Sequence, residues 1–382
     1  MNTRRILLEL LDAALRAVDG RECVERVLRH HDSGPVAVFA IGKAASAMAR
    51  GASASLGARI EQLFVITKDG HVDPELARLP RVTIVESAHP VPDERSLAAG
   101  AELTLRLIHL GAGVAPLFLV SGGSSSLVES LREGASLEEL RALNQRGLAA
   151  GWDISTLNAE RVKLSNLKGG GVARLLGQRA AMALFISDVA DDDPAIIGSG
   201  LLGRDRGRPD HITRHIVASI DGAVAAVVAA ALARGITLEH EAARFDGDVA
   251  GVAHEFLDAL RATHADGIVW GGESTVKLSD RHGRGGRNTH LALLAAKRLQ
   301  PGEGLTILAV GTDGTDGATG DAGAIVDAGT IERAELGGCD VERALREFDS
   351  GSALEAACDL VHTGPTGTNV GDLLIGLKSR RH

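Results

Sequence analysis

The stretch VAVFAIGKAAS, residues 36–46, determines the fold that we expect for this chain. Its apolar segment Val36–Ile41 has the length and composition of a buried strand and ends abruptly at Gly42 and Lys43. Alanine-rich sequence of helical character follows directly. A buried strand, a glycine turn and a helix in succession indicate the first part of a right-handed βαβ unit in a parallel sheet.

Six further apolar runs predict buried strands. They are Leu63–Thr67, Val82–Glu86, Leu117–Val120, Ala183–Ser187, Gly267–Trp270 and Leu305–Val310. Stretches of helical length separate several of them, namely Ser96–His109, Leu137–Ala150 and Ile216–Ala233. This alternation predicts an α/β protein with mostly parallel sheets. A loose charged stretch after Gly235 divides it into a larger Rossmann-like parallel-sheet domain (1–235) and a smaller α/β domain (236–382), with a cleft between them.

The composition excludes several classes of protein. Of 382 residues 47 are glycine, well above the usual share of about 7%, but they have no three-residue period, which excludes collagen. A hydrophobic content of 45% excludes a disordered chain. The net charge of −9 does not favour binding to nucleic acid. No apolar run is long enough to predict a membrane span. Three scattered cysteines favour a reducing, cytoplasmic environment, and the first 18 residues suggest an amphipathic helix rather than a signal peptide.

Glycine, small hydroxyls and charged residues follow five of the predicted strands. In α/β sheets ligands bind beyond the carboxyl ends of the strands, so these loops are candidate binding sites. The loop Ser121, Gly122, Gly123, Ser124, Ser125 offers backbone N–H groups and hydroxyls for a phosphate or carboxylate. Lys43 is placed to meet a substrate carboxylate or a transferring phosphoryl group. Walker A and GxGxxG motifs are both absent from the sequence.

Carboxylates crowd the end of another predicted strand, at Asp188 and Asp191–Asp193. Oxygen ligands of this kind suit Mg²⁺, and we select Asp188 and Asp193 as its candidate ligands. Asp193 also precedes a proline, so a role as a helix cap is the alternative.

Further candidate groups for an anion lie in three glycine-rich segments. Lys168, Gly169 and Gly170 follow a cation-rich stretch, which is alternatively an exposed basic helix with a glycine C-cap. In the segment GRGGRN, Arg287 is the better candidate for an oxyanion, and Arg284 is alternatively a turn residue. Near the C-terminus, Thr366 and Asn369 belong to a third loop of small residues.

The histidines have two interpretations. His211 and His215 have the i,i+4 spacing of helical metal ligands, but without an HExxH motif a surface or capping role is favoured. His89 lies in a proline-stiffened loop after a strand, where it lines a site or has a structural role.

These motifs together resemble the type-II glycerate kinase family. The matching segments are AIGKAASAMA, SAHPVPDERS, LVSGGSSSLV, LNAERVKLSNLKGGGVA, ISDVADDDPAIIGSG, GGESTVKL with GRGGRN, AVGTDGTDG and HTGPTGTNVGDL. They run in order from about Leu10 to Leu377, across a DUF4147 domain and a MOFRL domain. The resemblance implies a kinase that uses ATP and Mg²⁺ to phosphorylate D-glycerate at its 2-hydroxyl, giving 2-phosphoglycerate.

The resemblance also implies roles for particular residues. Lys43 and Arg287 correspond to the lysine of the family's GKA motif and the arginine of its GGRN motif, both expected to face the cleft. Asp188 and Asp193 match its SDV-DDP segment, and Asp313 matches its GTDG segment. Three site segments depart from the family pattern, namely 200–207, 160–165 and 288–290, where His290 replaces a glutamate.

The sequence thus predicts a glycerate 2-kinase in which Lys43 and Arg287 neutralise charge and either Asp188 or Asp313 accepts the hydroxyl proton. The altered segments leave a related hydroxy acid open as the acceptor. A hydroxypyruvate reductase and a non-catalytic binding protein for sugar acids are the alternatives from other classes. A small-molecule substrate is expected, with a homodimer as one option for the oligomeric state.

Overall fold

The computed structural model describes residues 3–31, 34–149, 154–204, 211–241, 243–276 and 282–379. The chain divides into two compact units, each with a six-stranded sheet. The N-terminal unit comprises Val18–Ser219 and Gly367–Asn369, and the C-terminal unit comprises Met1–Ala17, Ile220–Thr366 and Val370–His382. The predicted α/β class is confirmed. Among the described residues, no helix has both the length and the apolar character needed to cross a membrane.

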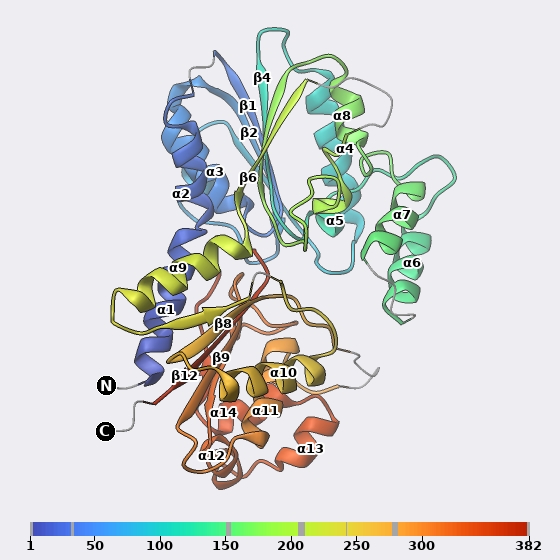
Figure 1. Ribbon diagram of the computed structural model, residues 1–382. Coiled ribbons are helices and arrows are strands. Elements are labelled where there is room, and N and C mark those ends of the chain that lie inside the picture. Colours follow the sequence, from blue (N-terminus) through green and yellow to red (C-terminus); the bar gives the residue numbers. More distant parts are fainter. Residues whose placement is uncertain are drawn as a thin grey trace. The chain divides into compact units, whose positions relative to one another are not determined.

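The sheet of the N-terminal unit is entirely parallel, with the strand order β3-β2-β1-β4-β5-β6. This is the order of a Rossmann-like doubly wound sheet, as predicted. Its strands are β1 (Val36–Ile41), β2 (Ile60–Lys68), β3 (Val82–Ser87), β4 (Ala115–Val120), β5 (Ala181–Ile186) and β6 (Ile212–Ala218). Every residue of β1 is buried, because helices cover both faces of this part of the sheet (Figure 1).

Helices α3 and α4 pack on opposite faces of this parallel sheet (Figure 1). The helices of the unit are α2 (Gly20–Leu28), α3 (Ala45–Leu56), α4 (Glu94–Ile108), α5 (Ser124–Leu127), α6 (Leu137–Ala149), α7 (Ile154–Leu164) and α8 (Gly171–Leu176), with short 3₁₀ turns at Gly57–Arg59, Leu76–Arg78 and Ile197–Ser199. On the side of α4 and α8 the core is apolar, and the rings of Phe39 and Phe118 stack there 5.2 Å apart.

The sheet of the C-terminal unit is mixed, so the prediction of mostly parallel sheets is wrong for this unit. Its order is β11-β10-β9-β12-β8-β7; among these strands, as far as the structure describes them, β7 and β8 pair in parallel and the other neighbours are antiparallel. Its strands are β7 (Leu238–His240), β8 (Gly267–Gly272), β9 (Leu305–Gly311), β10 (Gly323–Asp327), β11 (Leu360–Val361) and β12 (Asp372–Lys378). Turns rather than a crossover helix join β9 to β10, and the chain therefore returns antiparallel.

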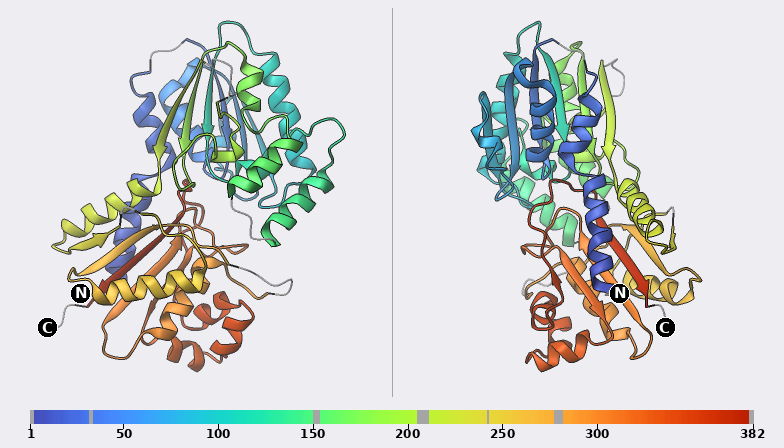
Figure 2. Two further views of the ribbon diagram at one scale, coloured as in Figure 1. Left: turned by 45° about the vertical axis from the view of Figure 1, so that its right-hand side comes forward. Right: turned by 90° about the vertical axis from the view of Figure 1, so that its left-hand side faces the viewer.

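Two groups of helices cover the C-terminal sheet (Figure 2). They are α1 (Thr3–Ala17), α9 (Ile220–Leu232), α10 (Val249–Ala262), α11 (Arg287–Arg298), α12 (Thr330–Leu336), α13 (Val341–Arg346) and α14 (Ser350–Ala356). The apolar faces of α10 and α11 form the main core with the strands, and α1 and α9 pack together against β12.

The compact units differ from the predicted division at residue 235. The predicted amphipathic helix α1 belongs to the C-terminal unit, where the Arg4 guanidinium donates to the Ile325 carbonyl oxygen (3.1 Å) and to Asp359 Oδ1 (2.8 Å). The Glu9 carboxylate pairs with Arg234 near the end of α9. Contacts between residues that are far apart in the sequence hold α1 and α9 in the C-terminal unit. The sequence pattern of neither helix reveals these partners.

The seven predicted strands are all present, but β6, β7, β10, β11 and β12 were not among the predicted strands. The last three residues of β6 were expected to begin a helix over Ile216–Ala233, which in fact starts at Ile220. His215 lies in β6, opposite Leu184, so the i,i+4 spacing of His211 and His215 is not helical. The favoured surface role fits His211, whose Nε2 lies 2.8 Å from Gln178 Oε1.

Gly100 tests how tightly α4 packs, and Gly251 in α10 is its control. A Cβ at Gly100 would overlap the carbonyl oxygen of Glu129, whereas a Cβ at Gly251 in α10 would meet open space. We expect Gly100→Ala to destabilise the protein by about 1–3 kcal/mol through overpacking. The matched control Gly251→Ala should stabilise it by up to about 1 kcal/mol, as alanine favours the helix. Urea unfolding measures both, and equal effects of the two substitutions would contradict the packing described here.

Candidate active site

The strand order of the N-terminal unit places two glycine loops side by side. Strand β1 pairs with β4 in the middle of the sheet, and from these two strands the sheet continues in opposite directions. Such a switch point is where doubly wound sheets bind ligands, beyond the carboxyl ends of the strands. The loop after β1 contains Gly42 and Lys43, and the loop after β4 is Ser121–Gly123.

The two loops are in direct contact. Gly42 has a φ of +129°, and a Cβ there would overlap Ser121 Oγ, so this position requires glycine. The Ser121 hydroxyl accepts a hydrogen bond from the Ala44 N–H (3.0 Å), and the Lys43 N–H donates to the Gly122 carbonyl oxygen (2.9 Å). These bonds fix the backbone of Lys43 against the loop that follows β4.

Polar side chains from three other segments converge on Gly122 and Gly123. A Cβ at Gly122 would overlap the carboxylate of Asp188 and the amide of Asn369. A Cβ at Gly123 would lie 3.1 Å from Lys43 Cγ and 3.2 Å from His89 Cδ2. The Asn369 Nδ2 also donates to Asp188 Oδ2 at 3.3 Å. The structure thus brings a cation, a carboxylate, an imidazole and an amide together around two glycines, Gly122 and Gly123.

Ser124 and Ser125 complete this loop. The Ser124 hydroxyl is buried and has no hydrogen-bond partner among the described residues. The Ser125 Oγ lies 2.7 Å from Ser199 Oγ, and the Ser199 hydroxyl also donates to Asn158 Oδ1. Among the described residues, the Ser124 hydroxyl therefore has unused hydrogen-bonding capacity, and it faces Gly198, where a Cβ would overlap it.

Polar groups of Lys168, Gly169 and Gly170 are engaged within the protein, and their expected contact with phosphate stays a prediction. Lys168 is fully buried and forms an ion pair with the equally buried Glu129. Burial lowers the pKa of Lys168, while the attraction of Glu129 opposes this shift. The Gly169 and Gly170 N–H groups donate to the carbonyl oxygens of Ser199 (3.0 Å) and Gly200 (2.7 Å). The segment supports the serine loop instead of offering free donors to a phosphate.

The two predicted metal ligands have different surroundings. Asp188 belongs to the convergent group described above, whereas Asp193 accepts a hydrogen bond from the Ala195 N–H (2.8 Å), as the alternative capping role requires. Across the described part of the chain, no cluster of three or more His, Cys, Asp or Glu side chains could hold a metal by itself. A metal at Asp188 would therefore need ligand oxygens from a bound phosphate.

In the C-terminal unit, Arg287 lies among carboxylates. Asp372 begins β12 opposite Gly272 and Gly311, the last residues of β8 and β9. The Arg287 guanidinium, about a third exposed, pairs with Asp372 (2.5 Å and 3.0 Å) and with Glu273 (2.5 Å). Burial alone would lower the pKa of Arg287, but these two carboxylates outweigh it and raise that pKa. The guanidinium is permanently charged and held in place.

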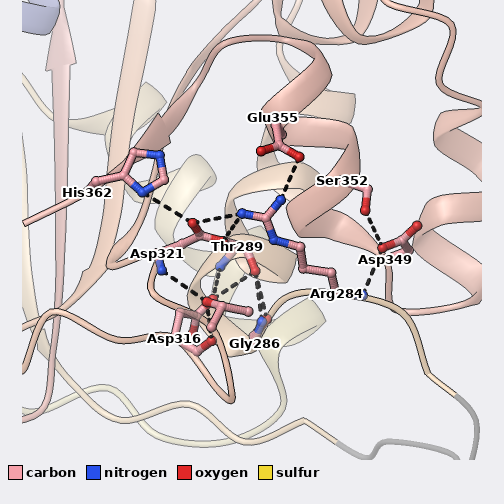
Figure 3. Close-up of polar contacts among 10 residues, drawn as sticks. Arg284, Gly286, Thr289, Asp316, Asp321, Asp349, Ser352, Glu355 and His362 are labelled. Carbon is pink, nitrogen blue, oxygen red and sulfur yellow. Dashed lines mark hydrogen bonds and ion pairs between the residues drawn. The ribbon is translucent and has the colours of Figure 1, made fainter. Parts of the chain in front are cut away.

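Asp316 fixes the start of α11, on which Arg287 is the first residue. Its two carboxylate oxygens accept the backbone N–H groups of Asn288 (3.0 Å) and Thr289 (2.8 Å). The Thr289 hydroxyl also donates to Asp316 Oδ2 at 2.8 Å, and the Gly286 N–H donates to that hydroxyl (Figure 3). The helix terminus is thus capped by the protein itself, so binding of an anion here would rely on Arg287.

Asp313 and Thr366 both lie near the end of β9 in the C-terminal unit. The Asp313 Oδ1 accepts hydrogen bonds from the N–H (2.9 Å) and the hydroxyl (3.1 Å) of Thr315. The Thr366 hydroxyl donates to the Thr312 carbonyl oxygen at 2.5 Å. This hydroxyl therefore supports the loop after β9.

The sequence did not reveal several residues that hold the candidate site together. Glu129, Asp316 and Asp372 are buried carboxylates that pair with cations or cap a helix. Asp372 had a recognisable signal, because it stands between a loop of small residues and the apolar run Leu373–Leu377. Glu129 had none, since its partner Lys168 is 39 positions away.

Comparison with known proteins identifies the class. Residues 6–233 match a domain of unknown function, DUF4147, and residues 267–372 match the MOFRL family. The chain is 33% identical to the D-glycerate 2-kinase of Thermotoga maritima, with 98% of each chain covered. It is 34% identical to a protein of Agrobacterium vitis provisionally named a hydroxypyruvate reductase, with 98% of this chain and 94% of the relative covered.

The crystal structure of a glycerate kinase from Thermotoga maritima has the same fold. It superposes with a TM-score of 0.86 at 30% identity and covers 99% of both chains. The chain therefore belongs to the type-II glycerate kinase family, as its motifs predicted.

His290, which stands where the family pattern has glutamate, predicts a pH dependence of stability. It is buried, its Nδ1 lies 2.8 Å from Ser350 Oγ, and burial lowers its pKa below 6.5. As the pH falls, His290 is therefore protonated in the unfolded chain before it is protonated in the folded protein. The stability that neutral His290 contributes is present above about pH 6.5 and is lost below it.

This contribution can be measured by urea unfolding between pH 7.5 and 5. The unfolding free energy of the wild type should fall by up to about 1.4 kcal/mol per pH unit more than that of His290→Gln. His254→Gln, which changes an exposed histidine, is the control and should follow the wild type. Parallel curves for wild type and His290→Gln would refute the assignment.

Proposed function

We propose that this protein is an ATP-dependent glycerate 2-kinase, which transfers the γ-phosphoryl group of ATP to the 2-hydroxyl of D-glycerate. The products are ADP and 2-phosphoglycerate. The observation that carries this proposal is the similarity to a D-glycerate 2-kinase over 98% of both chains. We expect the reaction in the cytoplasm, since three scattered cysteines suit a reducing compartment.

The nucleotide phosphates are proposed to bind at the switch point of the N-terminal unit. The loop Ser121–Ser125 and Lys43 lie there together, and the unpartnered Ser124 hydroxyl can donate to a phosphate oxygen. Phosphoryl transfer requires mainly positioning and stabilisation of negative charge, because the transition state spreads charge over the phosphoryl oxygens. The Lys43 ammonium supplies positive charge beside this loop.

Asp188 fits a magnesium ion that is shared with the nucleotide. A carboxylate oxygen is the donor that Mg²⁺ prefers, and one or two carboxylates suffice when phosphates complete the coordination. The Asn369 amide donates to Asp188 Oδ2 and orients the carboxylate. Bound there, Mg²⁺ would neutralise charge on the phosphate oxygens. Asp193 is the weaker candidate, because one of its oxygens already caps a turn.

Arg287 is proposed to bind the carboxylate of the acceptor. Its guanidinium is held by Asp372 and Glu273 but remains partly exposed, so a substrate carboxylate can compete for its donors. Asp188 and Asp313 are the two candidates that accept the proton of the hydroxyl. Substitution of each by asparagine separates them, since only loss of the base should abolish the acidic limb of the pH–rate profile, where protonation of the base lowers the rate.

A coupled assay with ATP, Mg²⁺ and D-glycerate tests the proposed activity. ADP should form only when D-glycerate is present, and NMR of the product should place the phosphate on carbon 2. Absence of ADP release at millimolar D-glycerate would refute the glycerate assignment. A related hydroxy acid that releases ADP in the same assay would identify a different acceptor.

Lys43→Ala tests the role of the lysine. We expect kcat to fall by about 10²–10³-fold, the usual cost of removing one group that stabilises transition-state charge. The urea midpoint should change little, since Lys43 is not a core residue. Lys297→Ala is the control, because that lysine is exposed near the end of α11, pairs with Glu342 and lies outside the site segments. A Lys43→Ala enzyme with wild-type kcat would exclude this role.

A hydroxypyruvate reductase is the second candidate, favoured by the name of the relative from Agrobacterium vitis. The absence of a GxGxxG motif argues against it. Oxidation of NADH or NADPH in the presence of hydroxypyruvate, without ADP formation in the kinase assay, would support the reductase over the kinase.

A further inference from the structure

Arg284 lies three residues before Arg287, and ion pairs with two acidic side chains hold its guanidinium (Figure 3). Its Nη2 donates to both carboxylate oxygens of Asp321 at 3.0 Å, and its Nη1 donates to Glu355 Oε2 at 2.6 Å. The Asp321 carboxylate is only 2% exposed and is also contacted by His362 Nδ1 at 3.2 Å. The guanidinium therefore joins α14 to the turn that precedes β10.

The backbone of Arg284 is fixed as well. Its N–H donates to Asp349 Oδ1 (2.8 Å), which also accepts the Ser352 hydroxyl, and its carbonyl oxygen accepts the Gly351 N–H (2.8 Å). The preceding Gly283 N–H donates to the Glu347 carbonyl oxygen at 2.8 Å. A single residue of the glycine loop thus makes five hydrogen bonds that tie the loop to α14 and its surroundings.

Only Gly285 and Gly286 separate this anchor from Arg287. A Cβ at Gly285, where φ is +135°, would lie 2.8 Å from Thr289 Oγ1, and a Cβ at Gly286 would overlap Asp316. The two glycines therefore pass closely over the first turn of α11 and contribute no side-chain packing of their own. The path of this linker is set at one end by Arg284 and at the other by the Asp316 cap.

We propose that Arg284 is a positioning residue for Arg287: by fixing the glycine loop 283–286 it sets where α11 begins and where the Arg287 guanidinium points. The inference rests on the proposed kinase function for its kinetic consequence, but its structural consequence is independent of activity. Arg284 itself is assigned no contact with substrate. Its effect is on geometry, where displacement of a catalytic group by about 1 Å can cost about 10²-fold in rate.

Arg333 provides a matched control in the same unit. It is exposed to a similar degree, 38% against 36% for Arg284, and also pairs with two carboxylates. One partner of each arginine, Asp359 or Asp321, has a side chain only 2% exposed. Loss of Arg333 should therefore destabilise the unit as loss of Arg284 does, without disturbing the start of α11.

Arg284→Gln and Arg333→Gln are compared by steady-state kinetics and by hydrogen exchange of the full-length protein. For Arg284→Gln we expect kcat/KM for D-glycerate to fall by about 10–100-fold while KM for ATP changes by less than about twofold. The N–H groups of residues 288–290 should exchange faster in this variant only. Arg284→Lys, which keeps one ion pair, should recover part of both properties and serves if the glutamine variant does not fold.

The outcomes separate the two proposals. Kinetics and exchange of Arg284→Gln that equal those of the wild type would overturn the positioning role. Equal losses in Arg284→Gln and Arg333→Gln would also overturn it, since general destabilisation then accounts for both. A wild-type protein without kinase activity would refute the proposed function, and the exchange of residues 288–290 would then decide the role of Arg284 alone.

Discussion

The candidate site depends on the close approach of two backbone segments at the ends of β1 and β4. Gly42, with its positive φ and no side chain, lets the Ser121 hydroxyl reach the Ala44 N–H, and the Lys43 N–H bonds back to Gly122. These local bonds act at the switch point of a parallel sheet, the position at which sheets of this kind bind ligands. A larger residue at position 42 would separate the loops and displace Lys43.

The two units hold their cationic groups in different ways. Lys43 lies over Gly123 beside His89, in a group that includes one carboxylate, Asp188. Arg287 is held by Asp372 and Glu273, so any anion that binds it competes with acids already present. This arrangement keeps a permanent charge in one orientation, and it suits a weakly held substrate carboxylate better than a tightly held phosphate. We therefore propose different roles for the two cations, with Lys43 beside a phosphate-binding loop and Arg287 binding the acceptor.

Much of the N-terminal fold could be predicted from the sequence, because a buried parallel strand followed by a glycine loop has a clear local pattern. The Val36–Ser46 segment shows it, and five of the seven predicted strands are parallel strands of this unit. The antiparallel pairing of β12 and the burial of Lys168 could not be predicted, since each depends on partners far away in the sequence. The segment around Lys168 has the composition of a phosphate-binding loop, but the Lys168 ammonium pairs with Glu129. The apolar sequence around Glu129 gives no sign of this ion pair.

The central claim, that ATP phosphates bind where β1 and β4 end, is tested most directly by hydrogen exchange with a non-hydrolysable ATP analogue and Mg²⁺. Residues 42–46 and 121–126 should exchange more slowly when the nucleotide is bound, and Lys43→Ala should reduce this protection. Protection confined to other segments, such as 168–171 or the start of α11, with no change at these two loops, would contradict the account.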